Sequence, residues 1–199
     1  MRHCKEEEDQ LWELYFDGSS CKEGARAGVL LISPGGEIVK LMYKLEFVTT
    51  NNTAEYEALI LGLKAAKDLG IQQITAYGDS ELVVRQVKNN YQVKQDLLKV
   101  YRNEVWDMLE NYFIAFNITH IPRNHNETAD SLALAASYFR IPKTTQLRYP
   151  IEVRYRPCVP DNVKHWRVFE DDIEIKKFLE LTDEFTNAQI DQEEDEGDE

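Results

Sequence analysis

The sequence has few of the residues that characterise secreted or membrane proteins. It contains only 3 cysteines in 199 residues. Cys4, Cys21 and Cys158 lie far apart, which excludes a zinc knuckle and argues against a disulfide framework. No apolar run approaches the roughly 18 residues of a membrane span, and the first ten residues lack the apolar core of a secretory signal. We therefore expect an intracellular protein, cytoplasmic or nuclear, that is not secreted and not bound to a membrane.

An excess of basic residues is also absent. The chain has 23 Lys+Arg against 36 Asp+Glu, a formal net charge of -13, which argues against a protein that coats DNA. Much of the acidity lies at the C-terminus, in the run Asp191–Glu199, which has no apolar side chain to bury. The acidity therefore says little about what the central region binds. With 43% apolar residues, that region has enough material for a core.

Changes in composition divide the chain into four predicted parts. These are an acidic arm over residues 1–10, a folded domain over 11–140, an extended proline-containing appendage over 141–182, and an acidic disordered tail over 183–199. The appendage holds 4 of the 6 prolines, which is too dense for a helix and unsuited to a central strand. One amphipathic helix fits within it, over Asp172–Leu181.

The folded domain begins with strands and then alternates helices with strands. Apolar patterns predict strands over Leu11–Asp17, Arg26–Ser33, Ile38–Glu46, Gln73–Tyr77 and Tyr112–Ile121. Helical periodicity predicts helices over Thr53–Asp68, Ser80–Lys88, Val93–Asn111 and Asn126–Tyr138. Short connections make the first three strands an antiparallel meander, and the later strand–helix–strand crossover implies a parallel section. We expect an α/β fold with a five-stranded mixed sheet, three antiparallel strands plus two parallel ones, flanked by helices.

Four carboxylates stand where a predicted strand ends or a predicted helix begins: Asp17, Glu55, Asp79 and Asp130. Asp17 is expected to end the first strand, because Gly-Ser-Ser follows it. Taken alone, each acid has an ordinary interpretation, as a helix N-cap, a first-turn residue or a turn residue. Their joint occurrence in one strand and helix pattern indicates a shared site.

Helical spacing separates two acids on the first helix. Glu55 shares its stripe with small and apolar residues and is expected to face inward, whereas Glu57 shares a stripe with Lys64 and Asp68 and is expected to face water. An inward acid costs free energy unless a partner compensates its charge. Divalent cations are the simplest compensation, because they prefer oxygen ligands.

The strings YFDGSS, TNNTAEYEALILGL, YGDSELVVRQV and HIPRNHNETADSLA resemble the four motifs of type 1 ribonuclease H. The resemblance covers Leu11–Tyr138. The short loop after Lys88 and the IPR–NETADSLA ending are most similar to the ribonuclease H domains of gypsy-type LTR retrotransposon polyproteins. RYPIEVRYRPCVPDN is similar to their connecting segment. That likeness implies reverse transcriptase and integrase regions of the same polyprotein as partners, and leaves the oligomeric state open.

The resemblance implies a metal-dependent endoribonuclease that cuts the RNA strand of RNA·DNA hybrids into fragments with 5′-phosphate and 3′-hydroxyl ends. By resemblance, Asp17, Glu55, Asp79 and Asp130 hold two Mg²⁺ ions, for which Mn²⁺ can substitute. Two alternatives stay open. One is a non-catalytic hybrid-binding or connector module of a polyprotein, and the other is a DNA nuclease with the same fold.

The resemblance also implies nucleic-acid contacts at Gly18, Ser19, Ser20, Thr50, Asn51, Asn52 and Ser80. Two features depart from the family: the basic protrusion is reduced to the nearly neutral KNNYQVKQ, and Val48 stands where an Arg often binds phosphate. Affinity for a hybrid is therefore expected to be modest and sensitive to salt.

A basic side chain often assists turnover in this family, from the loop before the last acid. His120 matches the spacing, ten residues before Asp130, but the glycines that usually surround it are replaced by Ile-Pro-Arg. His125 and Arg123 are alternatives in the same loop. The sequence does not choose among the three.

Overall fold

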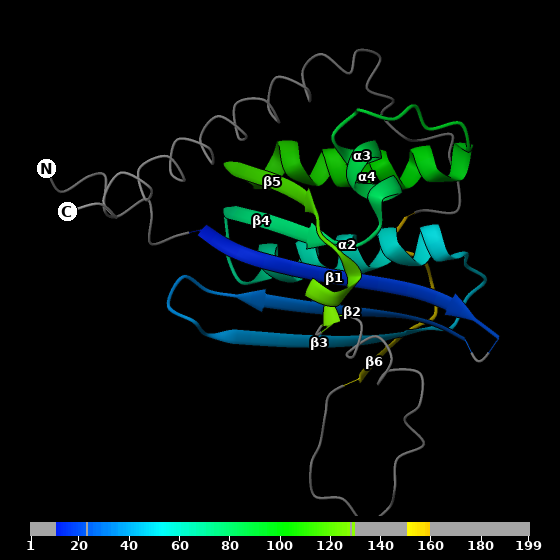
Figure 1. The fold of residues 1–199 in the computed structure, drawn as a ribbon. Coiled ribbons are helices and arrows are strands. Elements are labelled where there is room, and N and C mark those ends of the chain that lie inside the picture. The colour runs from blue at the N-terminus through cyan, green and yellow to red at the C-terminus, as the bar shows by residue number, and fades with distance from the viewer. Residues whose placement is uncertain (1–10, 23, 128, 130–150, 160–199) are drawn as a thin grey trace, which may run out of the picture.

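The computed structural model describes residues 11–22, 24–127, 129 and 151–159. A six-stranded mixed sheet forms the centre of the fold, with helices packed against it (Figure 1). The strands are β1 (Leu11–Cys21), β2 (Gly24–Ile32), β3 (Ile38–Leu45), β4 (Gln73–Gly78), β5 (Ala115–His120) and β6 (Ile151–Arg154). The helices are α2 (Asn51–Asp68), α3 (Glu81–Val87), α4 (Asp96–Tyr112) and the short 3₁₀ helix η1 (Arg123–His125).

The predicted fold class is confirmed. The strand order is β5-β4-β1-β2-β3-β6. β1, β2 and β3 pair antiparallel, and β4 and β5 continue the sheet in parallel beyond β1. The sixth strand, β6, was not predicted. It pairs in parallel with β3 at the opposite edge, so five strands was one too few.

The first strand does not end at Asp17, as the Gly-Ser-Ser sequence had indicated. β1 continues to Cys21, and Gly18, Ser19 and Ser20 pair with Ala27, Arg26 and Ala25 of β2. The antiparallel partner is long enough to satisfy the backbone of this stretch, which outweighs the low strand propensity of glycine and serine. Asp17 therefore lies within a strand, opposite Gly28 of β2.

Helix α2 begins at Asn51, two residues before the predicted start at Thr53. Thr50 is the N-cap, and Thr53 completes a capping box by accepting the backbone N–H of Thr50 at 2.7 Å. Glycines allow α2 to lie close to the sheet. A Cβ on Gly18 would lie 2.0 Å from the carbonyl oxygen of Ala54, and one on Gly62 would lie 2.6 Å from Leu14. The start of α2 is thereby fixed against β1.

The prediction that Glu57 faces water is wrong. Its side chain is fully buried and accepts a hydrogen bond from the Tyr101 hydroxyl of α4 at 2.7 Å. Glu57 lies where α2 contacts α4, and residues 151–159 cover this contact. The helical spacing within α2 alone carries no information about these partners from other parts of the chain.

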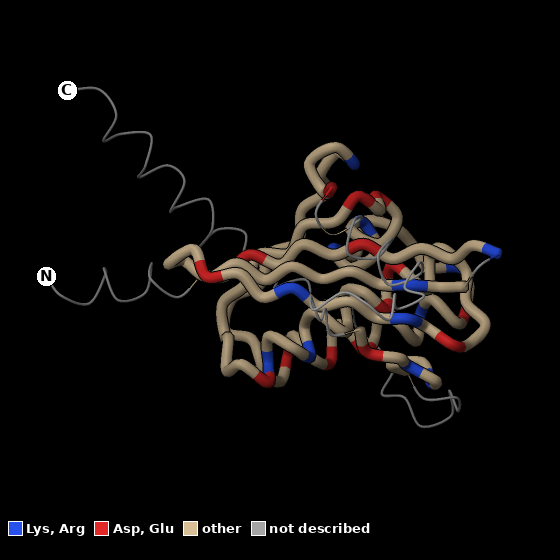
Figure 2. The backbone as a smooth tube through the Cα atoms, turned by 90° about the horizontal axis from the view of Figure 1, so that it is seen from below, with Lys and Arg blue, Asp and Glu red and all other residues tan. Residues whose placement is uncertain are grey.

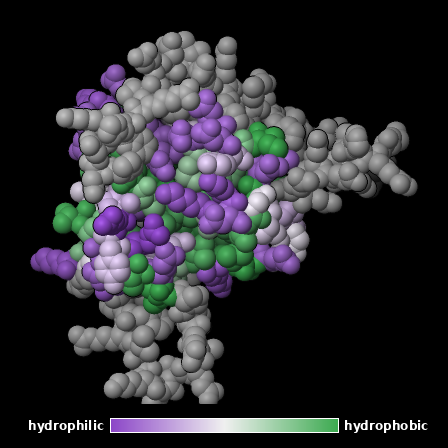
Figure 3. Space-filling model, turned by 180° about the vertical axis from the view of Figure 1, so that it is seen from behind, coloured by the Kyte–Doolittle hydropathy of each residue, from purple (hydrophilic) through white to green (hydrophobic). Residues whose placement is uncertain are grey.

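Charged residues are distributed over the whole fold. Lys and Arg lie among Asp and Glu along the described backbone, without a separate basic side (Figure 2). From behind, hydrophobic side chains reach the surface between hydrophilic ones (Figure 3). No helix within the described ranges is long and apolar enough to span a bilayer.

The helices predicted over Asn126–Tyr138 and Asp172–Leu181 lie outside the described residues, apart from the start of the former, and the four-part division of the chain stays a prediction.

Candidate active site

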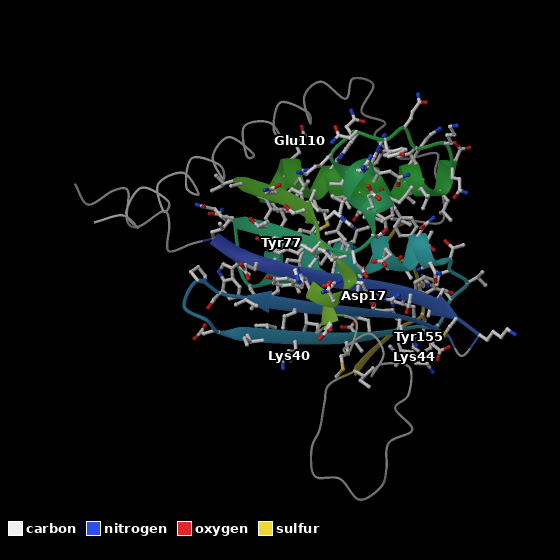
Figure 4. The ribbon with its side chains drawn as sticks, in the orientation of Figure 1. Asp17, Lys40, Lys44, Tyr77, Glu110 and Tyr155 are labelled. Atoms are coloured by element: carbon white, nitrogen blue, oxygen red, sulfur yellow. The ribbon has the colours of Figure 1, made fainter. Side chains whose placement is uncertain are left out.

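β1 and α2 bring the first two predicted acids together. Asp17 is 3% exposed. Figure 4 shows it on β1, beside the segment that follows β5. Glu55 lies in the second turn of α2, and its Oε2 accepts the backbone N–H of Gly18 at 3.2 Å. Because the start of α2 touches the backbone of β1, the carboxylate on the helix reaches the carboxylate on the strand.

The third predicted acid comes from the end of β4. Asp79 directly follows that strand, whose last residue Gly78 pairs in parallel with Phe16, the neighbour of Asp17. One carboxylate oxygen from each of Asp17, Glu55 and Asp79 lies within 4.8 Å of the other two. We call these three residues the acidic triad.

The triad gathers negative charge where little water reaches it. Burial raises the pKa of Glu55 well above its usual value, and the neighbouring charges of Asp17 and Asp79 raise it further. The hydrogen bond from Gly18 and the charge of Arg123 act on this pKa in the opposite direction. Close approach of three acids is costly unless a cation or a shared proton compensates it.

The donor set fits a divalent cation. Three carboxylates provide only oxygen ligands, the type preferred by Mg²⁺ and Mn²⁺. Asp79 Oδ1 is buried and has no hydrogen-bond partner among the residues that the structure describes. A buried carboxylate oxygen of that kind is suited to a metal ligand.

Comparison with known proteins agrees with this arrangement. The model of the reverse transcriptase-like family matches residues 15–136, more than half of the chain. Ribonuclease HI of Halobacterium salinarum is 40% identical over 121 residues, which are 60% of this chain and 60% of that protein. The chain belongs to the reverse transcriptase-like family. Its central region is a ribonuclease H-like domain.

Solved structures of ribonuclease H1 proteins are similar to the same part of this chain. The crystal structure of RNase H1 from the halophilic archaeon Halobacterium salinarum is similar with a TM-score of 0.58 and 37% identity, covering 62% of this chain and 95% of that one. LC11-RNase H1, solved in complex with an RNA/DNA hybrid, is similar with a TM-score of 0.57 and 29% identity, covering 62% and 94%. The chain nevertheless spans only 60% of the full length of the Halobacterium relative.

The structure describes only some of the remaining predicted catalytic residues of the ribonuclease H-like domain, and these differ in their distance from the triad. Asp130 lies outside the described residues. Arg123 is 73% exposed on its side chain, and its Nε lies 3.8 Å from Asp79 Oδ2. His120 is exposed at the end of β5, opposite Gly78 in the register, and His125 is exposed in η1. Of the three basic candidates, Arg123 is the one for which the structure gives a contact with the triad.

Most of the predicted nucleic-acid contacts of the ribonuclease H-like domain lie around the start of α2, whereas Ser80 lies at the start of α3. The backbone N–H of Ser20 donates to Asn51 Oδ1 at 2.8 Å, and the Ser20 hydroxyl donates to the carbonyl of Thr49 at 2.9 Å. The hydroxyls of Thr50 and Ser80 cap α2 and α3. Gly18 and Ser19 are on β1 and Asn52 is in the first turn of α2. The structure brings Ser20 and Asn51 into contact, but it does not test the binding of nucleic acid.

One residue near the triad was missed by the sequence analysis. Asn126 is 1% exposed, and its Nδ2 donates to the carbonyl of Phe16 at 2.8 Å. It fixes the segment after η1 to the strand that carries Asp17. The only sequence signal was its place in the NETADSLA string, since 110 residues separate Asn126 from Phe16.

Proposed function

We propose that this chain is a metal-dependent endoribonuclease that hydrolyses the RNA strand of RNA·DNA hybrids and leaves 5′-phosphate and 3′-hydroxyl ends. The convergence of the acidic triad carries the proposal. The relative that was solved with an RNA/DNA hybrid supports the choice of substrate.

The proposed ligands of two Mg²⁺ ions, or Mn²⁺ in their place, are the triad and Asp130. When bound, such ions activate water and stabilise the charges that develop on the phosphate and on the departing 3′ oxygen. The carboxylates of Asp17, Glu55 and Asp79 would hold the cations, whose positive charge would offset the repulsion between the carboxylates and the phosphate. The N–H of Gly18 keeps the Glu55 carboxylate in place.

The protein groups beside the triad would orient the scissile strand. Asn51 is exposed, and because its Oδ1 accepts the N–H of Ser20, its Nδ2 is available to donate to a ligand. Hydroxyl and amide groups of this kind can recognise the 2′-hydroxyls that distinguish an RNA strand. The Arg123 guanidinium lies next to Asp79 and would interact with a phosphate or a departing oxygen.

We further propose an origin in a gypsy-type retroelement polyprotein, on the motif likenesses described above, with reverse transcriptase and integrase regions as partners and an intracellular location. The four-part division of the chain belongs to this proposal. Lys and Arg are interspersed with Asp and Glu along the described backbone (Figure 2), so partner regions would contribute to holding the hybrid.

A substrate panel tests the proposed activity. End-labelled RNA·DNA hybrid, DNA duplex, RNA duplex and single strands of one sequence are incubated with the protein at low salt, in Mg²⁺, in Mn²⁺ and in EDTA. We expect internal cuts in the RNA of the hybrid, with either metal and not in EDTA. Binding without cleavage would favour the connector role, and cleavage of the DNA duplex would favour a DNA nuclease.

A further inference from the structure

The chain returns to the sheet over residues 151–159, which we call the strap. Ile151 lies opposite Met42 of β3 and Arg154 opposite Leu45. Beyond β3, the N–H of Glu46 donates to the carbonyl of Arg154 at 2.8 Å. At its far end Val159 is 5% exposed and belongs to the hydrophobic core. The strap is therefore attached at both ends.

Two side chains of α2 bind the backbone of one strap residue. Glu57 accepts the N–H of Cys158 with both carboxylate oxygens, at 2.9 and 3.1 Å. Lys64 Nζ donates to the carbonyl oxygen of the same residue at 3.3 Å. Glu57 and Lys64 lie about two helical turns apart on one face. An acid and a base placed in this way recognise a peptide backbone and not a particular side chain.

Glu57 is built into this role. Its carboxylate is fully buried and accepts hydrogen bonds from the Tyr101 hydroxyl and the N–H of Cys158. A buried carboxylate is tolerated only where donors satisfy it. Lys64 also lies 3.7 Å from Glu104 of α4. Release of the strap would remove one donor from Glu57 and one acceptor from Lys64 at the contact between α2 and α4.

The strap does not pack against β3 and α2 along its whole length. A cavity of about 430 Å³ lies between β3, α2 and β6, and Glu152 and Arg154 of the strap form part of its lining. Tyr155 follows β6 at the same edge of the sheet (Figure 4) and is 73% exposed. The strap is attached by the ladder to β3, by the backbone contacts of Cys158, by the Cys158 side chain packed against the core, and by the buried Val159.

The strap lies beyond residues 15–136, which match the family. The edge of β3 would otherwise expose unpaired backbone groups. We propose that this edge, Glu57 and Lys64 together form a binding site for an extended backbone segment. Residues 151–159 of the same chain occupy the site, and their binding holds β3 and α2 in position. The folded unit of this chain therefore includes residues 151–159, beyond the boundary predicted at residue 140.

The test uses the full chain with Cys158→Pro, which removes the N–H that Glu57 accepts, and with Cys158→Ala, which keeps it. Hydrogen exchange is followed at the Glu46 amide, whose acceptor is the carbonyl of Arg154. We expect at least tenfold faster exchange in Cys158→Pro and a lower melting temperature, with Cys158→Ala close to wild type. Loss of protection across the whole sheet in Cys158→Pro alone would also support the proposal. Wild-type protection of Glu46 in Cys158→Pro would overturn it.

A second pair of variants tests the other attachment. Val159→Asp places a charge where the side chain is buried, whereas Val153→Asp, on β6 and 39% exposed, serves as control. We expect faster exchange at Glu46 in Val159→Asp only. Equal exchange in the two variants would contradict a strap fixed at Val159. None of these measurements uses hybrid cleavage, so the result does not depend on the proposed function.

Discussion

The backbone N–H of Gly18 donates to Glu55 Oε2 at 3.2 Å across 37 positions of sequence. This bond links the strand that carries Asp17 to the helix that carries Glu55. The contact is possible because residue 18 has no Cβ, since a Cβ there would lie 2.0 Å from the carbonyl oxygen of Ala54. The geometry of the triad depends on this close approach.

Gly18→Ala is accordingly expected to displace α2 from β1. Overpacking of this kind costs about 1–3 kcal/mol of folding free energy, and hybrid cleavage should fall with it because Glu55 moves. Gly35→Ala is the matched control, because its Cβ would meet only Ser33 Oγ at 3.7 Å. Denaturant unfolding and gel cleavage measure both effects. Equal stability of the two variants would contradict the steric argument.

Glu55→Gln is expected to stabilise the metal-free protein at neutral pH. Burial, Asp17 and Asp79 raise the pKa of Glu55 in the folded state above its usual 4.5. The folded state therefore binds this proton more tightly than the unfolded chain does. The stabilisation is complete below about pH 4.5 and is lost as pH rises through the raised value. Gln is uncharged throughout and avoids that loss.

The measurement is thermal unfolding in EDTA from pH 4 to pH 8. The difference between Glu55→Gln and wild type should be small at pH 4 and should grow as the pH rises. Glu37→Gln, at an exposed position in a turn, is the control. A Glu55→Gln protein less stable than wild type at pH 8 would show that the carboxylate is satisfied without a metal.

Divalent metal should make wild type more stable than Glu55→Gln. A ligand at 100 times its dissociation constant stabilises the folded state by about 2.7 kcal/mol, so Mg²⁺ or Mn²⁺ should raise the melting temperature of wild type. Asp79→Asn should remove most of this rise. Asp96→Asn, where the side chain is 88% exposed on α4, should keep it. A rise of the same size in both variants would place the metal elsewhere.

Asn126→Asp is expected to weaken the domain and its activity. The substitution keeps the shape but replaces the Nδ2 donor by an oxygen that faces the carbonyl of Phe16. Leaving a buried polar group unsatisfied costs about 1–3 kcal/mol, and the strand that carries Asp17 lies next to it. Asn124→Asp, at an exposed position two residues earlier, is the control. Wild-type stability and cleavage in Asn126→Asp would exclude a positioning role.

The two described cysteines should react at very different rates. Burial, followed by the charge of Glu57, raises the pKa of the Cys158 thiol to about 12, whereas Cys21 is exposed. Only the thiolate is nucleophilic, so Cys158 should resist iodoacetamide at pH 8 until the protein unfolds. Alkylation resolved by mass spectrometry checks this at each site. Rapid labelling of Cys158 in the native protein would mean that the strap is released.

Local pattern was sufficient to predict much of the fold. Alternation and apolar runs predicted five strands. The acid within β1 and the acid that follows β4 are close to each other because those strands are parallel neighbours. Glu55 was placed correctly because α2 presents small and apolar residues to the sheet. The triad could therefore be predicted before its geometry was known.

Features that depend on distant partners could not be predicted. The strand character of Gly18–Ser20 depends on β2, and the burial of Glu57 depends on Tyr101 and Cys158, 44 and 101 positions away. β6 has only four residues and acquires its strand conformation from β3. In each case tertiary contacts outweighed local preference.

The most direct test of the central claim compares single-turnover cleavage of an RNA·DNA hybrid by wild type, Asp17→Asn and Asp96→Asn in Mg²⁺. Circular dichroism confirms that all three are folded. We predict that Asp17→Asn loses at least about a thousandfold in rate, equivalent to about 4 kcal/mol of transition-state stabilisation, while Asp96→Asn matches wild type. Equal rates for Asp17→Asn and wild type would contradict a nuclease centre built on the acidic triad.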